Sequence, residues 1–124
     1  MSNAQPDTAR KSIIRSLNDQ FRQTFTGGAV VITAGIAALD EVTRLRIFAA
    51  VQTFDAFDED NDPWREHDFG AFEVDVCLPG SATTRERVFF KIEYYDLTQA
   101  MHAEDPADTT KTERVMTIML ASEY

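Results

Sequence analysis

Two runs of residues in the second half of the chain alternate between apolar and polar side chains, which is the pattern of strands with one buried face. The runs cover residues 72–76 and 88–95, and the Pro79-Gly80-Ser81 segment between them is typical of a turn. We therefore predict an antiparallel hairpin. The residues that it would direct into the core are Phe72, Val74, Val76, Val88, Phe90, Ile92 and Tyr94.

Two segments before the hairpin repeat apolar residues at the three- and four-residue steps of an amphipathic helix. The first starts near Pro6 and stops at Gly27-Gly28, and the second starts at Asp40 and continues to Phe54. The second is apolar around much of its circumference, so we expect it to be the more buried helix. The first has a stripe of Ile13, Ile14, Leu17, Phe21 and Phe25, with Lys11, Arg15 and Arg22 on its opposite, solvated side.

Two further strands are predicted, at residues 29–33 and at residues 114–121. Together these elements predict an α+β fold in which two helices pack on one face of a mainly antiparallel sheet of about four strands. A chain of 124 residues can build one hydrophobic core but hardly two. We therefore expect a single domain over residues 1–124, with a flexible tail at residues 1–5.

Several classes of protein do not fit this composition. The longest apolar run, residues 29–32, is far shorter than the roughly 20 residues of a membrane-spanning helix, and the N-terminus lacks a basic-then-apolar signal pattern. The single cysteine, Cys77, rules out an internal disulfide, and its place in a strand without a nearby cation favours packing over reactivity. We expect a soluble, cytoplasmic protein that does not bind membranes.

Negative charge is concentrated in the second half of the chain. The formal net charge is −9, to which residues 1–54 contribute +2 and residues 55–124 contribute −11. Nucleic-acid binding depends mainly on basic side chains that neutralise phosphates, so we expect no direct contact with nucleic acid. A basic or nucleic-acid-binding protein is the partner that fits this charge, although net charge also serves solubility alone.

Residues 61–70 place an Asp-Pro turn, a tryptophan and a Glu-His-Asp triplet between an acidic run and a strand. The aspartates of residues 58–62 have the spacing of a calcium-binding loop, but Pro63 replaces the required glycine, so no EF-hand is predicted. We expect no cofactor, although carboxylates from separate elements could hold Mg²⁺ or Mn²⁺. The metal candidates are Asp62, Glu66 and Asp68.

His67 is a candidate general base, because Glu66 or Asp68 beside it could orient the imidazole. A polar patch with Lys91 and Tyr95 is predicted on the second face of the hairpin, near the carboxylates of residues 73 and 75. If the loop folds over this patch, the groups form one active-site candidate. Otherwise the patch consists of cross-strand ion pairs, and the loop is tied down by its own hydrogen bonds.

A series of short motifs extends along nearly the whole chain. They are Leu17-Asn18-Asp19, Asn61-Asp62-Pro63 with Glu66-His67-Asp68-Phe69-Gly70, Lys91-Ile92 with Tyr94-Tyr95-Asp96, Asp105-Pro106-Ala107-Asp108, and Arg114-Val115 with Thr117-Ile118-Met119-Leu120 and Glu123-Tyr124. In this order they resemble one family of small bacterial domains of unknown function, with Glu93 in place of the family's usual aspartate. The resemblance implies a context, since its members are often encoded on plasmids and other mobile elements, and it implies no mechanism.

Two functions from different classes fit these observations. The first is a non-enzymatic acidic protein-interaction module, an accessory of a mobile element that acts as a DNA mimic or anti-defence inhibitor. The alternative is a small metal-assisted or acid/base enzyme that uses the Glu-His-Asp loop and the Lys/Tyr sheet patch. Carboxylates exposed over a broad surface favour the first, and convergence of His67, Lys91 and Tyr95 in one pocket favours the second.

We expect the interaction module, because the sequence carries no recognised catalytic signature. The residues expected to bind a partner are Asp58, Asp60, Asp62, Trp64, Glu66, His67, Asp68 and Asp96. The residues that would carry catalysis in the alternative are His67, Glu66, Asp68, Lys91 and Tyr95.

Overall fold

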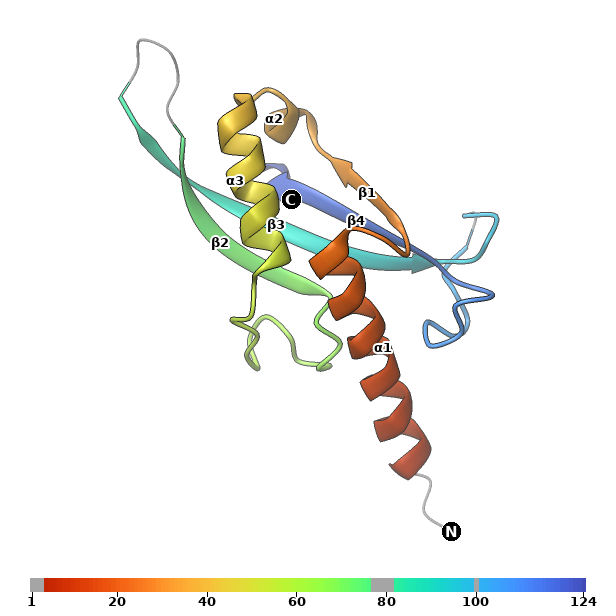
Figure 1. The fold of residues 1–124 in the computed structure, drawn as a ribbon. Coiled ribbons are helices and arrows are strands. Elements are labelled where there is room, and N and C mark those ends of the chain that lie inside the picture. The colour runs from red at the N-terminus through yellow and green to blue at the C-terminus, as the bar shows by residue number, and fades with distance from the viewer. Residues whose placement is uncertain (1–3, 77–81, 100) are drawn as a thin grey trace.

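Over the residues that the structure describes, the fold is α+β, with a four-stranded sheet and three α-helices, of which the short α2 was not predicted (Figure 1). The computed structural model describes residues 4–76, 82–99 and 101–124, with side chains from residue 8 onward. The predicted turn at Pro79-Gly80-Ser81 lies outside these residues. The elements in chain order are α1 (Ala4–Thr24), β1 (Ala29–Ile32), α2 (Ala34–Ala37), α3 (Glu41–Gln52), β2 (Phe69–Val76), β3 (Thr84–Tyr95), β4 (Glu113–Leu120) and the 3₁₀ turn η1 (Ala121–Glu123).

The strands lie in the order β1-β4-β3-β2. The predicted hairpin of β2 and β3 is confirmed, and β3 also pairs antiparallel with β4. The pairing of β1 with β4 is parallel, which the sequence did not predict. A parallel partner needs a crossover connection, and here the chain from β1 to β4 passes through α2, α3 and the hairpin. The sheet is therefore mixed, with β1 and β2 at its edges.

The core lies between the sheet and the helices α1, α2 and α3, which cover one face (Figure 1). The predicted alternation is confirmed in β3, where Val88, Phe90 and Ile92 are buried. Gly70 of β2 leaves room for the Phe90 ring, because a Cβ at this position would collide with it. The buried cluster consists of Phe21, Ile36, Leu39, Ile47, Val51, Phe54, Val76, Val88, Phe90, Ile92, Met116 and Ile118.

The helix α3 begins where the sequence predicted, with Asp40 as its N-cap accepting the Thr43 N–H at 3.2 Å. The sequence predicted α3 to be the more buried of the two predicted helices because it is apolar around much of its circumference, but two of its apolar residues, Val42 and Leu45, are 57% and 58% exposed. Only the stripe that includes Ile47 is packed against the core. Among the described residues, no helix is long and apolar enough to cross a membrane.

Candidate functional site

The loop of residues 53–68 connects α3 to β2, and its own side chains hold its first half. The Asp58 carboxylate accepts the backbone N–H groups of Asp60 and Asn61, each at 2.9 Å. The Asn61 side chain accepts the N–H of Asp58 at 3.0 Å and donates to the carbonyl of Ala56 at 3.0 Å. Short Asp and Asn side chains reach backbone groups two or three residues away, which is why such segments form stable turns.

Asp62 organises the second half of the loop from a buried position. Its side chain is 4% exposed, and its Oδ1 atom accepts the N–H groups of Glu66 at 2.9 Å and His67 at 3.1 Å. Arg65 and His67 have φ angles of 57° and 55°, in the left-handed region that non-glycine residues rarely adopt. Such strained residues persist only where surrounding bonds hold them, and Asp62 supplies two of those bonds.

His67 is held by contacts on several sides. Its Nδ1 donates to Asp19 Oδ1 at 2.7 Å, and its Nε2 lies 3.6 Å from Asp62 Oδ2. The Phe57 ring stacks on the imidazole with the ring centres 3.9 Å apart. A carboxylate on Nδ1 fixes the orientation and tautomer of an imidazole, which is the arrangement found in general-base histidines.

Asp19 comes from α1 and is itself held by Arg22. The Arg22 guanidinium donates to Asp19 Oδ1 at 2.8 Å and lies 5.0 Å from the centre of the Phe57 ring. We predicted Arg22 on the solvated side of α1, and this is wrong, because its side chain is only 4% exposed. It lies one turn beyond the buried Asn18, and a guanidinium tolerates this burial because the neighbouring carboxylate offsets its charge.

Asn18 is fully buried and joins α1, the loop and the sheet. Its amide group donates to the carbonyl of Glu66 at 2.9 Å and to the Tyr94 hydroxyl at 2.7 Å, and its Oδ1 accepts from Arg114 Nε at 2.8 Å. The Tyr94 hydroxyl donates to Glu66 Oε1 at 2.9 Å. Burial raises the pKa of Tyr94 and lowers the pKa of Arg114. The position of Glu66 therefore depends on α1 and β3, which supply Asn18 and Tyr94, and on β4, whose Arg114 holds Asn18.

Glu66 and Asp68 flank His67 in the sequence, but the carboxylate that orients its ring belongs to Asp19. Glu66 is bonded to Tyr94 instead, and the backbone carbonyl of Asp68 accepts the N–H of Ile92 at 2.7 Å. Burial, and then the neighbouring Glu66 carboxylate, raise the pKa of Asp68 to about 6. Folding thus disfavours the charged form of Asp68.

Lys91 and Tyr95 lie on the opposite face of the sheet from His67. They alternate along β3 with the residues that face the helices. Lys91 Nζ lies 3.8 Å from Glu93 Oε1, and the Tyr95 hydroxyl donates to Glu93 Oε2 at 3.2 Å. The structure therefore does not bring Lys91 or Tyr95 together with His67.

The predicted proximity of this patch to the carboxylates of β2 is wrong. Register places Lys91 opposite Phe69, at the other end of the hairpin from Glu73 and Asp75. Those two carboxylates accept from Arg85 instead, at 2.8 Å and 2.9 Å. Alternation identified the correct face, but it could not determine which residues of the two strands stand opposite each other.

The other predicted binding residues are divided between the loop and a distant turn. Trp64 is 65% exposed, with Lys11 Nζ 5.7 Å from its ring centre. Asp58 and Asp60 are exposed on the first half of the loop. Asp96 follows β3, where its carboxylate accepts the N–H and the hydroxyl of Thr98 at 3.1 Å and 2.6 Å.

Two of the three metal candidates, Asp62 and Glu66, already have hydrogen-bonding roles. Asp62 Oδ1 serves two backbone N–H groups, and Glu66 Oε1 serves Tyr94. Within the described part of the chain, no group of three or more His, Cys, Asp or Glu residues is arranged to hold a metal ion. A magnesium or manganese site made by Asp62, Glu66 and Asp68 stays a prediction for experiment.

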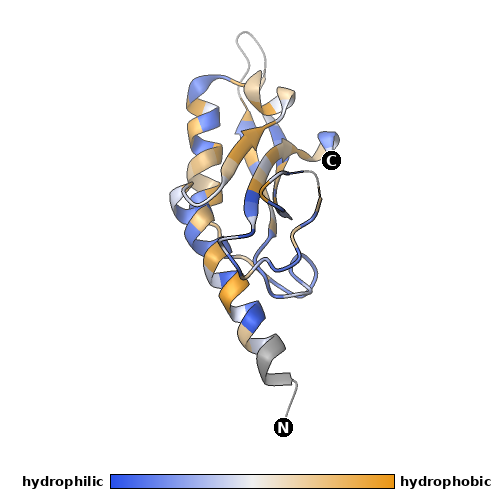
Figure 2. Cartoon of the chain, turned by 90° about the vertical axis from the view of Figure 1, so that its right-hand side faces the viewer, coloured by the Kyte–Doolittle hydropathy of each residue, from blue (hydrophilic) through white to orange (hydrophobic). Residues whose placement is uncertain are grey.

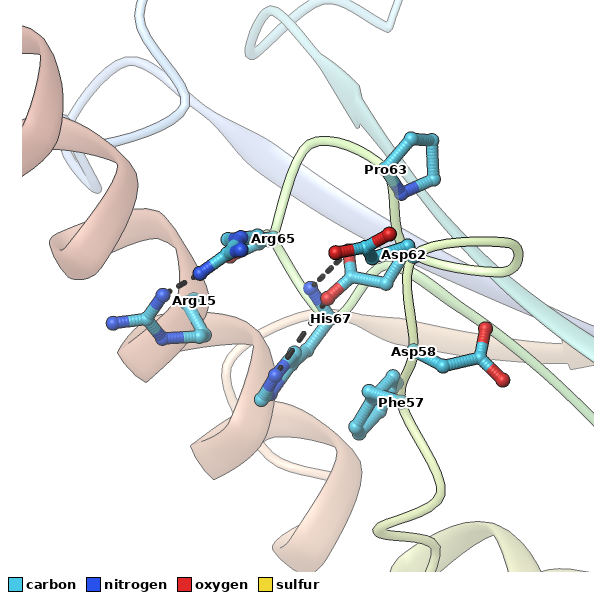
Figure 3. Close-up of a pocket in the computed structure, with 8 residues that line it drawn as sticks. Arg15, Phe57, Asp58, Asp62, Pro63, Arg65 and His67 are labelled. Atoms are coloured by element: carbon cyan, nitrogen blue, oxygen red, sulfur yellow. Dashed lines mark hydrogen bonds and ion pairs between the residues drawn. The ribbon is translucent and has the colours of Figure 1, made fainter.

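A pocket of about 610 Å³ opens beside His67, between α1 and the loop (Figure 3). Its wall combines carboxylates, two arginines and the aromatic ring of Phe57. This volume lies in the range of small-molecule sites, and the polar groups on its wall could orient a ligand. The lining residues are Arg15, Phe57, Asp58, Glu59, Asp62, Pro63, Arg65 and His67.

Sequence reasoning missed the residues that α1 contributes, although one signal was present. Asn18 lies between Ile14 and Phe21 on the apolar stripe, at a helical position that faces the core. A polar residue at such a position needs buried hydrogen-bonding partners, so it marks a site where another element delivers polar groups. No comparable local signal distinguishes Asp19 or Arg22.

We compared the chain with known proteins. No curated protein and no solved structure matches it. A family model described as a protein of unknown function (DUF3768) matches residues 32–123. The match includes the loop of residues 53–68 and the strands β2, β3 and β4, whereas α1 lies outside it. Because the match spans most of the chain, the protein belongs to the family of proteins of unknown function designated DUF3768.

Proposed function

We propose that the protein is a non-enzymatic protein-interaction module whose contact surface is the acidic loop, defined as residues 55–60. The observation that carries this proposal is that four carboxylates of the loop are exposed while hydrogen bonds fix its backbone. A fixed loop loses little conformational freedom on binding, so more of the interaction energy appears as affinity. The four carboxylates belong to Asp55, Asp58, Glu59 and Asp60.

An exposed aromatic residue near the acidic loop supports the same proposal. Trp64 is 65% exposed and follows Pro63, which lines a pocket together with Asp58 and Glu59. Tryptophan is among the residues that contribute most to binding energy at protein interfaces. A large apolar side chain beside fixed charges can anchor a partner that the charges attract from a distance.

The partner class that we propose is a basic, nucleic-acid-binding protein such as a nuclease or another defence protein. The carboxylates would occupy its groove in place of DNA phosphates, which makes the module a DNA mimic. The net charge of −9 supports long-range attraction to such a groove and repulsion from nucleic acid itself. The mobile-element context implied by the family resemblance is one in which an inhibitor of defence proteins would act.

The proposal is tested by capture of basic proteins on the immobilised protein from a bacterial lysate, followed by titration with the purified captured protein. In the variant Asp55→Asn/Glu59→Gln/Asp60→Asn, three carboxylates are removed whose side chains make no hydrogen bond among the described residues, so the fold should be retained. We expect the variant to lose binding. Binding by the natural sequence should weaken as salt rises, and duplex DNA should compete for the captured protein.

The matched control Glu41→Gln/Glu86→Gln/Glu104→Gln removes the same charge from other parts of the surface. This control should bind nearly as well as the natural sequence if the acidic loop makes the contact. An equal loss of binding in the loop variant and the control would show that binding depends on net charge alone and not on the acidic loop. Full binding by the loop variant would refute the proposed contact surface.

An acid/base enzyme is the second candidate, and the observation that favours it is the Asp19–His67 pair on the wall of the pocket. In this function His67 would accept a proton while Asp19 holds its ring. Lys91 cannot take part, because it lies on the other face of the sheet. Turnover of a carboxylic ester, phosphate ester or oligonucleotide by the protein, abolished in folded His67→Gln, would support this candidate; no turnover of these substrates would count against it.

A further inference from the structure

Within the described part of the chain, no α-helix covers one face of the sheet. The helices α1, α2 and α3 lie on the other side, which Figure 2 shows in a side view for α1 and α3. Among the described strand residues that point away from these helices, only Met119 is buried. We call this side of the sheet the outer face. The centre of the outer face is formed by Lys91 together with Val31, Phe69, Ala71, Phe89, Thr117 and Met119.

Strand register brings these central residues together. Phe69, Lys91 and Thr117 stand in one row across β2, β3 and β4, and Ala71, Phe89 and Met119 stand in the adjacent row. The rings of Phe69 and Phe89 are 5.2 Å apart, and the exposed ring of Tyr124 packs on both. The solvated face of an antiparallel sheet is normally polar, so an aromatic centre indicates that a partner covers it.

Charge indicates which partner fits. The strand residues of the outer face include three cations, Arg85, Arg87 and Lys91, and four carboxylates, Glu73, Asp75, Glu93 and Glu113. The net charge of these strand residues is therefore −1, and it becomes −3 with Asp58 and Asp60, which line a hollow with Phe69 and Phe89, whereas the whole chain carries −9. A face with both signs of charge around a largely apolar centre has the composition of an interface core with a polar rim. Because cations and carboxylates lie on the same face, two copies can pair opposite charges across a two-fold axis.

The outer face is also large enough for a dimer interface. Strands spaced about 4.8 Å apart and rising about 3.3 Å per residue give a face of roughly 500 Å² for this sheet. Two such faces in contact bury roughly 1,000 Å², which is the lower bound for a specific interface.

We propose that the outer face is a homodimer interface, in which the sheets of two copies pack face to face as in a β-sandwich. Asp58 and Asp60 line a hollow together with Phe69 and Phe89, so the acidic loop borders the proposed interface, while Glu59 lines the pocket beside His67. The dimer therefore carries two acidic loops at the edges of one interface. This inference goes beyond the proposed function and does not depend on it.

Sedimentation velocity over a range of concentrations tests the proposal. The protein should reach twice the 14.0 kDa mass of the chain, and association should strengthen with salt because salt screens the repulsion between two chains of −9. The acidic-loop interaction should weaken with salt instead. Failure of one proposal is therefore distinguishable from failure of the other.

The variant Thr117→Lys places a second ammonium group beside Lys91 on the outer face of each copy and should weaken the dimer by about a hundredfold or more, because these cations would lose water and repel one another. Tyr124→Lys provides a second test at the exposed end of the chain, with little risk to folding. The control Val42→Lys/Leu45→Lys puts two charges on the exposed side of α3 and should leave the dimer intact.

Three results would overturn the proposal. The first is a monomer at all concentrations up to about 200 µM. The second is unchanged dimerisation in both Thr117→Lys and Tyr124→Lys when circular dichroism shows that the variants are folded. The third is loss of the dimer in the α3 control, which would place the interface on that helix.

Discussion

Replacing Asn18 with alanine should destabilise the fold strongly, although the residue occupies a helix, where alanine is the preferred residue. Asn18 is fully buried and makes three hydrogen bonds to groups from the loop and the sheet. The substitution leaves the Glu66 carbonyl and the Arg114 Nε without these partners. Tyr94 retains Glu66 Oε1 as its acceptor, so its loss is smaller.

The magnitude follows from the groups that lose their bonds. Each buried polar group left unsatisfied costs about 1–3 kcal/mol. Two such groups and a small cavity, less about 0.5 kcal/mol of improved helix propensity, give a loss of about 3–5 kcal/mol. Domains are typically stable by about 5–15 kcal/mol, so this loss would lower the unfolding temperature by roughly 10–20 °C.

Urea unfolding followed by circular dichroism measures this difference in the free energy of unfolding. Gln20→Ala is the matched control, because Gln20 lies on the same helix with its side chain in solvent. It should change stability by less than about 0.5 kcal/mol. If Asn18→Ala costs no more than Gln20→Ala, the hydrogen-bond network does not fix the loop as the structure indicates, and the reasoning fails.

Three further predictions concern the loop and the sheet. Folding raises the pKa of Asp68 to about 6, so the stability that its protonated carboxyl contributes below about pH 4 is lost as pH rises through 6. Asp68→Asn should therefore raise the free energy of unfolding at about pH 8 and leave it unchanged at about pH 4. Equal effects of the substitution at both pH values would contradict this prediction. Gly70→Ala should cost about 1–3 kcal/mol in urea unfolding, because its Cβ meets the Phe90 ring, and a neutral effect would refute that clash. Added Mg²⁺ or Mn²⁺ should not shift the unfolding temperature of chelator-treated protein, whereas a shift of several degrees that Asp62→Ala or His67→Ala abolishes would support the metal-dependent enzyme.

The two proposals combine in a simple way. A dimer that presents two acidic loops can engage two sites on one basic partner, and the second contact then forms at a high effective concentration. Binding affinity increases in this way only if the two sites on the partner are as far apart as the two acidic loops of the dimer. A Thr117→Lys monomer should therefore bind a two-site partner more weakly, while its contact with a single site is unchanged.

The strand predictions succeeded because they depend on a local pattern. The alternation in residues 88–95 is visible without knowledge of any partner strand, and the structure buries Val88, Phe90 and Ile92 accordingly. The start of α3 at Asp40 was equally local, since a capping side chain bonds to a backbone group three residues later. Such features depend on covalent geometry and on neighbours within one turn of the chain.

The failed predictions concern how elements meet. Charge and helical spacing placed Arg22 in solvent, but the loop of residues 53–68 packs over this part of α1 and buries it. Helical spacing likewise did not show that Val42 and Leu45 of α3 would be 57% and 58% exposed. A helical wheel shows which side chains share a side, and it does not show which sides another element covers.

The sequence by itself determined the class of fold, the order of most elements and the surplus of negative charge, because periodicity and composition are properties of neighbouring residues and of totals. Only the tertiary structure decided that Asp19, and not Glu66 or Asp68, holds His67, and that His67 lies on the helix side of the sheet, away from Lys91. Asp19 and His67 are 48 positions apart. Their contact depends on α1 packing against the sheet beside a loop with two left-handed residues, and no local pattern encodes that arrangement.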